Sequence, residues 1–413
     1  MSVLYNIAVI IVGFALKIIR FFSPKIKLFV DGRKTIFQQL RNHIDTEDHI
    51  IWFHVASLGE FEQGLPVIEK LKTEFPSYKT LVTFFSPSGY EVKKHSKAAD
   101  LITYLPLDTK RNVSEFLDLV QPKLAVFVKY EFWPNYLSGL RHRNIRTILI
   151  SGIFRKEQAF FKSYGGWMRR SLRTFDHFFV QDENSKTLLN ELQFENVSVS
   201  GDTRFDRVAE ILERDNTLKF VEAFKQNNLC VTIGSSWPED EALLVPFINE
   251  TAVNDVKFII APHHVKAEQV ASLKNAITKK TVLFSEKTDK ELEDYEVLII
   301  DSIGLLTKVY SYADIAYVGG GMGSTGLHNT LEPAVFGIPV VIGKVYENFK
   351  EAKDLVRIGG ILSIASKEEL ARTLHRLLTD NAERDRIGTI NREFTQKNRG
   401  ATIQIMDFLR TRV

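Results

Sequence analysis

The stretch Tyr317-Val-Gly-Gly-Gly-Met-Gly-Ser-Thr-Gly-Leu-His-Asn-Thr-Leu-Glu-Pro333 indicates the fold and a ligand site. An apolar run over 314–318 predicts a buried strand, five glycines follow it, and a short helix with Glu332 is expected to stop at Gly337. Glycines let a ligand approach the backbone, and a helix N-terminus offers unpaired N–H groups and a positive dipole end. The stretch therefore indicates a phosphate or nucleotide site. A tight strand-to-helix connection without a ligand is the alternative.

The composition is that of a globular protein with full cores. Of 413 residues, 44% are hydrophobic and 25% charged, and the length favours two or three domains. A net charge of +3 is too small to indicate nucleic acid as the main partner. Cys230 is the only cysteine, so no disulfide framework or cysteine-based metal site is expected, and the compartment is predicted to be reducing. The thiol is expected to be buried and inert.

The N-terminus departs from this average. The run Val3–Leu16 is apolar apart from Asn6, and Lys17 and Arg20 follow it. As a helix, 14 residues reach about 21 Å, short of the roughly 30 Å hydrocarbon core of a bilayer. We expect either a tilted span or a helix lying in the membrane interface, with its basic flank cytoplasmic. A helix docked on a soluble core is the alternative, and a signal peptide fits poorly because the positive charge comes after the apolar run.

Strand and helix patterns alternate after residue 34, which predicts parallel sheets covered by helices on both faces. Thirteen strands are too many for one doubly wound sheet, so we predict two Rossmann-like domains facing each other across a cleft. The predicted domains are 1–34, a membrane-associated helix and basic flank; 35–200; and 201–413, whose last helix is expected to pack across the junction. The predicted strands are 50–56, 80–85, 101–105, 124–130, 147–151, 178–181, 197–200, 230–234, 257–261, 281–284, 297–301, 315–318 and 340–342.

Loops after strands are where ligands bind in such sheets, and two of them in the first half carry acids. Ser57, Gly59 and Glu60 follow the first strand, where Glu60 is either a helix-capping carboxylate or a general base. Lys129 and Glu131 end the fourth strand, where they form either a surface pair or part of the site.

Four further loops offer groups that bind anions. Arg204 is a candidate clamp for phosphate or carboxylate, with a salt bridge to Asp202 or Asp206 as the alternative. Ser235 or Ser236 is expected to cap the helix that follows the strand at 230–234. Adjacent His263 and His264 should point apart, so a shared metal is not expected. The remaining candidates, beside the glycine loop, are Asn348, Phe349 and Lys350.

Several of these motifs together resemble the 3-deoxy-D-manno-octulosonic acid (Kdo) transferases of Gram-negative lipopolysaccharide assembly. They occur in the order and spacing of that family and cover nearly the whole chain. The motifs are Ser57-Leu-Gly-Glu60, Glu131-Phe-Trp-Pro-Asn135, Gly201-Asp-Thr-Arg-Phe-Asp206, Gly319-Gly-Gly with His328-Asn329 and Leu331-Glu332, and Asn348-Phe-Lys350.

The resemblance implies a GT-B fold and an inverting transfer of Kdo from CMP-Kdo to a lipid A precursor (lipid IVA), at the cytoplasmic face of the cell inner membrane. No cofactor and no metal are implied. By motif, Glu60 looks like the general base and Glu131 like a second acid, with Ser57, Gly59 and Lys129 on the acceptor side. The implied CMP-binding residues are Arg204, Ser235, His263, Gly320, Gly321, Gly323, His328, Asn329, Glu332, Asn348 and Lys350.

The chain departs from the family pattern at three places: Lys129 stands where many members have an acid, His263-His264 replaces an arginine-containing loop, and Thr330 replaces a proline. These differences bear on the donor contacts. Two other functions stay open: a GT-B transferase that uses a UDP-sugar on a lipid-linked acceptor, and a non-catalytic sugar-nucleotide binder at the membrane.

Overall fold

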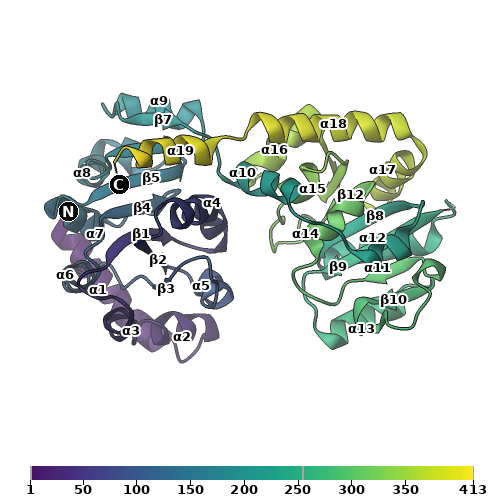
Figure 1. Ribbon diagram of the computed structural model, residues 1–413, viewed down its shortest axis with the longest axis horizontal. Coiled ribbons are helices and arrows are strands. Elements are labelled where there is room, and N and C mark those ends of the chain that lie inside the picture. Colours follow the sequence, from purple (N-terminus) through teal and green to yellow (C-terminus); the bar gives the residue numbers. More distant parts are fainter. Residues whose placement is uncertain (1, 254, 413) are drawn as a thin grey trace. The chain divides into compact units, whose positions relative to one another are not determined.

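The computed structural model describes residues 2–253 and 255–412, and the chain forms two compact units (Figure 1). The first unit is Met1–Arg207 with Arg399–Val413, and the second is Val208–Asn398. The segment 201–207 therefore belongs to the first unit, whereas the sequence-based division had assigned it to the second domain. The C-terminal helix returns to the first unit, as the sequence had led us to expect. The helix α10 (Arg204–Ala209) contains the boundary.

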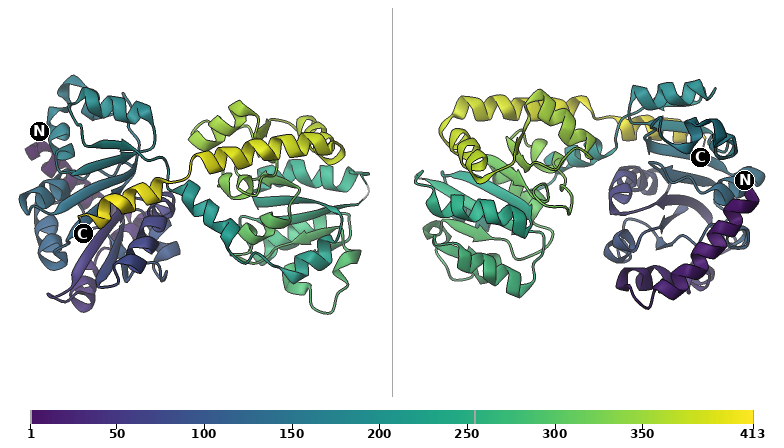
Figure 2. Two further views of the ribbon diagram at one scale, coloured as in Figure 1. Left: turned by 45° about the horizontal axis from the view of Figure 1, so that its top comes forward. Right: turned by 180° about the vertical axis from the view of Figure 1, so that it is seen from behind.

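The first unit is built on a seven-stranded sheet whose strands are all parallel (Figure 2). The strand order is β3-β2-β1-β4-β5-β6-β7, so the direction of winding reverses between β1 and β4. The strands are β1 (His49–Val55), β2 (Tyr78–Phe84), β3 (Leu101–Tyr104), β4 (Leu124–Val128), β5 (Arg146–Gly152), β6 (His177–Val180) and β7 (Val197–Val199).

The second unit has its own parallel seven-stranded sheet, in the order β10-β11-β9-β8-β12-β13-β14. Its winding reverses between β8 and β12. The strands are β8 (Leu229–Ser236), β9 (Val256–Pro262), β10 (Thr281–Leu283), β11 (Val297–Ile299), β12 (Ile315–Val318), β13 (Val340–Gly343) and β14 (Ile361–Ile364). The prediction of two Rossmann-like units with parallel sheets is confirmed, and β14 is the strand it missed.

Helices cover the faces of both sheets, as short βα connections require. In the first unit they are α1 (Ser2–Ile19), α2 (Pro24–Asp31), α3 (Ile36–His43), α4 (Leu58–Glu74), α5 (Pro87–Lys93), α6 (Lys110–Val120), α7 (Pro134–His142), α8 (Gly166–Leu172), α9 (Glu183–Glu191) and α19 (Ala401–Arg410). In the second they are α11 (Lys219–Lys225), α12 (Pro238–Glu250), α13 (Ala267–Ala276), α14 (Leu306–Val309), α15 (Leu331–Ala334), α16 (Lys350–Ile358), α17 (Lys367–Thr379) and α18 (Asn381–Lys397).

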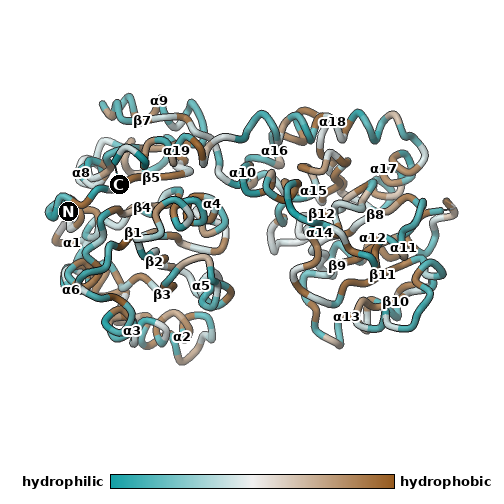
Figure 3. Tube along the Cα trace, in the orientation of Figure 1, coloured by the Kyte–Doolittle hydropathy of each residue, from teal (hydrophilic) through white to brown (hydrophobic). Residues whose placement is uncertain are grey.

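Each sheet is buried on both faces, which is why its strands read as continuous apolar runs (Figure 3). On β1, Trp52 packs into one hydrophobic cluster while its neighbours Ile51 and Phe53 pack into another. On β8, the neighbours Val231 and Cys230 likewise pack into two different hydrophobic clusters. Burial raises the pKa of the Cys230 thiol to about 12, so the thiolate is disfavoured and the prediction of an inert cysteine is supported.

Figure 2 shows the N-terminal helix α1 lying against the first unit, and polar side chains of α1 form hydrogen bonds with that unit. The Tyr5 hydroxyl donates to Asp108 (2.6 Å), and Asn135 Nδ2 donates to the Asn6 side chain (2.9 Å). The long apolar side chains of α1 are instead exposed, Phe14 by 66%. Among the described helices, α1 included, none combines the length and the apolar character that a membrane span needs.

Candidate functional site

The sequence-predicted site residues lie at the carboxyl ends of strands, close to the point in each sheet where the winding reverses. In open α/β sheets this is where ligands bind, because loops on the two sides of the reversal lead away in opposite directions. In the first unit Glu60, in the first turn of α4, follows β1, and Lys129 follows β4; these strands are hydrogen-bonded neighbours. In the second unit Ser235 lies at the end of β8 and the glycine stretch follows β12, and these strands are again neighbours.

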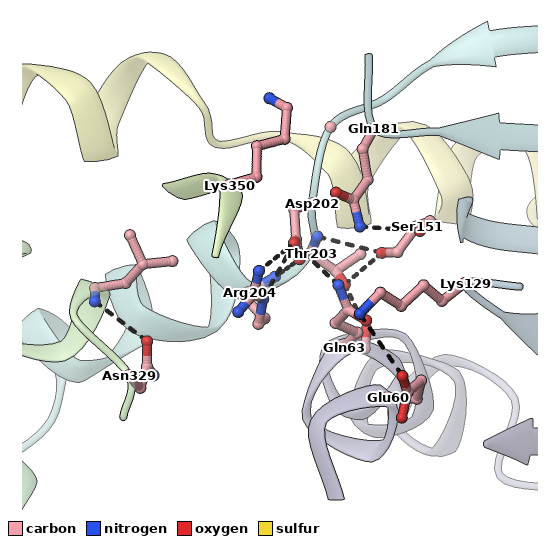
Figure 4. Close-up of polar contacts among 12 residues, drawn as sticks. Glu60, Gln63, Lys129, Ser151, Gln181, Asp202, Thr203, Arg204, Asn329 and Lys350 are labelled. Carbon is pink, nitrogen blue, oxygen red and sulfur yellow. Dashed lines mark hydrogen bonds and ion pairs between the residues drawn. The ribbon is translucent and has the colours of Figure 1, made fainter. Parts of the chain in front are cut away.

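Glu60 lies in the first turn of α4, where the positive end of the helix dipole stabilises a carboxylate. Its side chain is only 8% exposed. The Ser57 hydroxyl donates a short hydrogen bond to Oε2, and Lys129 Nζ lies 3.7 Å from Oε1. Gly59, between them, leaves the turn uncrowded, since a Cβ there would meet only the Ser57 hydroxyl at 3.8 Å. The residues predicted for the acceptor side therefore lie around Glu60, and Figure 4 shows Lys129 beside it.

Glu131 belongs to a second polar cluster, at the end of β4. Its carboxylate accepts a hydrogen bond from Trp133 Nε1 (3.0 Å) and lies 3.4 Å from His54 Nε2. The buried His54 ring is held from the other side, with Nδ1 2.9 Å from the Thr83 hydroxyl. Glu131 is thus fixed by an indole and an imidazole, and no direct contact joins it to Glu60 in the described structure. His54 was not among the site residues predicted from the sequence.

Arg204 belongs to the first unit, whereas the sequence-based division placed it in the second domain; its contact with CMP stays a prediction. Its guanidinium donates to the buried Asp202 carboxylate from Nε (3.0 Å) and from a terminal nitrogen (2.8 Å). Asp202 also accepts a hydrogen bond from Gln63 of α4 (2.9 Å), as Figure 4 shows. The Arg204 side chain keeps the pKa of Asp202 below its usual range despite burial. The observed pairing is the salt bridge that the sequence had left as the alternative.

In the second unit, the glycine loop after β12 folds tightly on itself. Gly320 has φ of +89°, and a Cβ at that position would lie 2.1 Å from the Gly326 carbonyl oxygen. A Cβ on Gly321 would lie 2.9 Å from the Gly343 nitrogen, so this segment also packs closely against the end of β13. At these two positions only glycine fits without a backbone shift. The backbone N–H groups of residues 323–326 form no hydrogen bond within the described part of the chain.

Asp240, which the sequence had not singled out, holds this loop in place. Its carboxylate is fully buried and accepts hydrogen bonds from the Gly320 N–H (2.8 Å), the Tyr317 hydroxyl (2.8 Å) and the Trp237 N–H (3.0 Å). Burial and the Asp240 charge raise the pKa of Tyr317. One carboxylate therefore joins β12, the glycine loop and the start of α12. The only sequence signal for it was an acid in the first turn of a helix, which is common.

The helix that follows the glycine loop is shorter than predicted. The segment α15 is a single turn, so it supplies little dipole, and Asn329 Oδ1 accepts the Leu331 N–H at its start (3.2 Å). Asn329 Nδ2 donates to Glu332, which also accepts a hydrogen bond from the Thr307 hydroxyl (both 3.1 Å). The Thr330 hydroxyl is buried and has no hydrogen-bond partner among the described residues. The loop backbone, rather than a helix dipole, is the source of N–H donors here.

An aromatic cluster lies beside the loop. Trp237 stacks on His263 with ring centroids 4.3 Å apart, and its Nε1 donates to His328 Nε2 (3.1 Å). Burial and the neighbouring His263 lower the pKa of His328 to about 4, and burial also lowers that of His263. The His263 and His264 rings lie 4.6 Å apart and both contact Trp237, so the prediction that they point apart is wrong, because irregular backbone follows β9.

The remaining predicted donor residues surround the same loop. Ser235 has φ of +54°, and its carbonyl would lie 2.3 Å from a Cβ on Gly319. A Cβ on Gly323 would meet the Glu239 carboxylate carbon at 3.1 Å. Asn348 and Lys350 are exposed, and Lys350 pairs with Asp354 at 3.3 Å. The predicted helix cap at Ser235 or Ser236 is wrong: Trp237 precedes the first turn of α12, and Ser236 donates to Glu241.

Each unit thus carries its own polar cluster, and the two clusters differ in chemistry. The first unit offers a held carboxylate at Glu60, suited to accepting a proton from a hydroxyl group. The second offers backbone N–H groups and neutral imidazoles, which suit a phosphate ester. Among the described residues, no group of three or more histidine, cysteine, aspartate or glutamate side chains is placed to hold a metal ion.

Comparisons with known proteins agree with the predicted resemblance. Residues 31–207 match a family model described as 3-deoxy-D-manno-octulosonic-acid transferase (kdotransferase). A 3-deoxy-D-manno-octulosonic acid transferase of Haemophilus influenzae is 29% identical over 385 residues, 87% of this chain and 86% of that protein. The protein of the same name from Aquifex aeolicus is 27% identical over 340 residues, 81% of this chain and 87% of that protein.

A solved structure also shares the fold. The UDP-GlcNAc 2-epimerase of Neisseria meningitidis superimposes with a TM-score of 0.62, covering 88% of this chain and 100% of that one, at 15% identity. At this identity the likeness shows the two-unit α/β fold alone. The two transferases, by contrast, align with 87% and 81% of this chain and carry the same name.

Proposed function

We propose that this chain, a glycosyltransferase and a relative of the Kdo transferases, transfers Kdo from CMP-Kdo to a hydroxyl group of a lipid A precursor, lipid IVA. The donor binds to the second unit and the acceptor sugar to the first. The reaction is a single displacement with inversion at the anomeric carbon, and it needs no metal ion. The family match and the position of Glu60 support this proposal together.

In the proposed reaction Glu60 accepts the proton of the acceptor hydroxyl. The oxygen then forms a bond to the anomeric carbon of Kdo, while the bond from that carbon to the phosphate oxygen breaks and its electrons leave with CMP. Negative charge therefore moves from the carboxylate of the first unit to the phosphate of the leaving group. A base that is already held by the Ser57 hydroxyl and the helix N-terminus needs little reorganisation when it acts.

The second unit would stabilise the charge that develops on CMP. The N–H groups of residues 323–326 are donors available for the phosphate, because they have no other hydrogen-bond partners in the described part of the chain. His328 is neutral at physiological pH, since its pKa is about 4, so it acts through hydrogen bonding rather than charge. Its Nε2 accepts from Trp237, which leaves Nδ1–H as the donor.

The proposed acceptor is a lipid, so the enzyme has to work at a membrane surface. The exposed apolar side chains of α1 are of the kind that inserts into the interface of a bilayer, and Lys17 in the last turn of α1 would attract anionic lipids. We therefore propose an interfacial location at the cytoplasmic face of the inner membrane. No nucleic acid is involved.

The observation that carries the proposal is the position of Glu60: a buried carboxylate at the winding reversal, bonded to Ser57 and next to Lys129. Replacing it in Glu60→Gln keeps the shape but removes the base. We expect transfer from CMP-Kdo to lipid IVA to fall by roughly 10²–10⁴-fold, with unchanged CMP binding.

The matched control is Glu62→Gln on the same helix, where the carboxylate pairs with Lys93 (2.9 Å) and is not part of the site. Near-normal turnover of a folded Glu60→Gln variant would remove the base assignment. Thermal unfolding with CMP or UDP tests the donor separately, because stabilisation by UDP alone would favour a UDP-sugar transferase.

A further inference from the structure

A cavity of about 500 Å³ lies in the first unit beneath α1, outside the cluster around Glu60. We call it the α1 cavity. Part of its wall is apolar, formed by residues of α1, α2, α3 and the loop that follows β3. Those residues are Leu16, Phe29, Val30, Phe37, Pro106 and Leu107. Its size is that of pockets that take small ligands.

The rest of the wall is basic. Lys17, Arg20, Arg33 and Lys34 line the cavity. The one carboxylate that pairs with them is Asp31, which lies 3.0 Å from Arg20 and 2.7 Å from Lys34. Because one carboxylate faces four cations, the cavity keeps an excess of positive charge.

The four cations do different things. Arg33 is committed to the fold, because its guanidinium donates to the carbonyl oxygens of Leu105, Phe29 and Phe85 at 2.7–2.9 Å. Lys17 and Lys34 are exposed at the rim, and Lys17 forms no ion pair within the described residues. The rim therefore suits an anionic group, while the apolar wall suits a hydrocarbon chain.

The position of the cavity fits such a ligand. It adjoins α1, whose apolar side chains are exposed, and the turn beyond it, where Phe21 and Phe22 are exposed by 73% and 85%. Pro106 and Leu107 follow β3. This strand is parallel to β1 and lies two strands from it, so the carboxyl ends of both strands are on the same side of the sheet. Neighbouring strands are about 4.8 Å apart, so the cavity begins roughly 10 Å along this edge from the loop with Glu60.

We propose that the α1 cavity binds one anionic amphiphile, with its phosphate on Lys17 and Lys34 and one hydrocarbon chain against Leu16, Phe29 and Phe37. This chemistry has two sources, an anionic phospholipid of the bilayer and a phosphorylated, acylated acceptor. The second source rests on the proposed function, whereas the binding itself does not.

The test uses the full-length protein and dihexanoyl phosphatidylglycerol below its micelle concentration, with binding followed by calorimetry and native mass spectrometry. We expect saturable binding of one molecule. The double variant Lys17→Gln/Lys34→Gln should bind about tenfold more weakly, since it loses charge-assisted hydrogen bonds to phosphate. The matched control Lys25→Gln/Lys27→Gln removes the same charge from exposed positions of α2 outside the cavity, and it should bind normally.

A third variant, Val30→Trp, fills the apolar part without changing charge, and thermal unfolding checks that it folds. Weaker binding by this variant is also expected. The proposal is overturned if no saturable binding occurs, or if both lysine pairs weaken binding equally, because that is the behaviour of diffuse charge attraction.

A competition experiment identifies the source. Displacement of labelled dihexanoyl phosphatidylglycerol by lipid IVA assigns the cavity to the acceptor, and retention assigns it to a bilayer lipid; both outcomes require the site. The Kdo transfer assay is run in parallel on the unmodified protein. Absence of transfer together with lipid binding contradicts the proposed function alone, and transfer without lipid binding contradicts the cavity alone.

Discussion

Lys129 Nζ lies 3.7 Å from Glu60 Oε1, and the lysine that makes this approach has backbone φ of +70°. The left-handed region costs a residue with a Cβ roughly 1 kcal/mol, and glycine adopts it freely. The strand β4 ends at Val128, and this turn directs the Lys129 side chain to the neighbouring loop. The strain is therefore found at a position where the side chain serves the site.

The first prediction separates stability from activity at this position. Lys129→Gly should raise the free energy of unfolding of the first unit by about 0.5–1 kcal/mol, because the strain is relieved. It should also lower the transfer rate, because the cation beside Glu60 is lost. Chemical unfolding and the transfer assay measure the two effects.

The control for this change is Gln121→Gly. Gln121 also has positive φ (+39°), at the end of α6, and it is exposed and outside the site. The Gln121→Gly variant should have a higher free energy of unfolding than the unmodified protein and the same transfer activity. Equal activity of Lys129→Gly and the unmodified protein would mean that Lys129 has no part in the reaction.

The second prediction concerns Asp240. In Asp240→Ala, three buried groups lose the oxygen that accepts their hydrogen bonds: the N–H of Gly320, the N–H of Trp237 and the hydroxyl of Tyr317. We expect a loss of about 2–4 kcal/mol in the stability of the second unit and weaker CMP binding, because buried donors lose their acceptor. The adjacent Glu239 is exposed, so Glu239→Ala should leave stability nearly unchanged. An unaltered melting temperature of Asp240→Ala would contradict the role given to this carboxylate.

The parallel sheets could be predicted from sequence because buried strands read as apolar runs of the right length. The strand β14 was missed because Leu362 and Ser363 are partly or fully exposed, and the segment follows two glycines. The positions of Glu60 and the glycine loop could also be predicted, since a loop directly follows each strand.

What could not be predicted depends on contacts between segments far apart in sequence. Asp240 accepts a hydrogen bond from Gly320, 80 positions away, and nothing local distinguishes it from an ordinary acid in a first helical turn. Arg204 was assigned to the wrong domain because its partner Asp202 and the contact of Asp202 with Gln63 are tertiary features. The orientation of α1 could not be predicted either, because it also depends on tertiary contacts. From the sequence alone, its apolar side chains suggested burial or a membrane span.

The third prediction compares two glycines that both have positive φ. Gly320 (φ +89°) has no room for a Cβ, which would lie 2.1 Å from the Gly326 carbonyl oxygen, whereas Gly359 (φ +81°) has no atom within 4 Å. Gly359→Ala should cost only about 1 kcal/mol, the conformational part. Gly320→Ala should cost more and abolish CMP binding, because the loop has to move. Calorimetry on both variants measures this, and normal CMP binding by Gly320→Ala would exclude the loop as the phosphate site.

The fourth prediction is a pH dependence from His328. Its pKa of about 4 lies below the ordinary 6.5, so the folded state holds the ring neutral while the unfolded chain takes up a proton below pH 6.5. The stability of the second unit should therefore fall as the pH drops from 6.5 towards 4. His328→Gln, which still offers an acceptor to Trp237, should reduce this slope, whereas His375→Gln at an exposed position should not. NMR titration of His328 gives the pKa directly, and a midpoint near 6.5 would contradict the prediction.

The fifth prediction tests whether the exposed apolar face of α1 holds the protein at a membrane. Ile11 and Phe14 are 61% and 66% exposed, so Ile11→Ser/Phe14→Ser should leave the free energy of unfolding nearly unchanged. If the face enters a bilayer interface, each side chain contributes about 1.5–3 kcal/mol there, and the double variant should bind anionic vesicles at least roughly tenfold more weakly. The control is Ile303→Ser, which removes an equally apolar side chain, 86% exposed, from the second unit. Vesicle sedimentation measures all three proteins; equal loss in the control, or no loss in the α1 variant, would show that α1 does not provide the membrane contact.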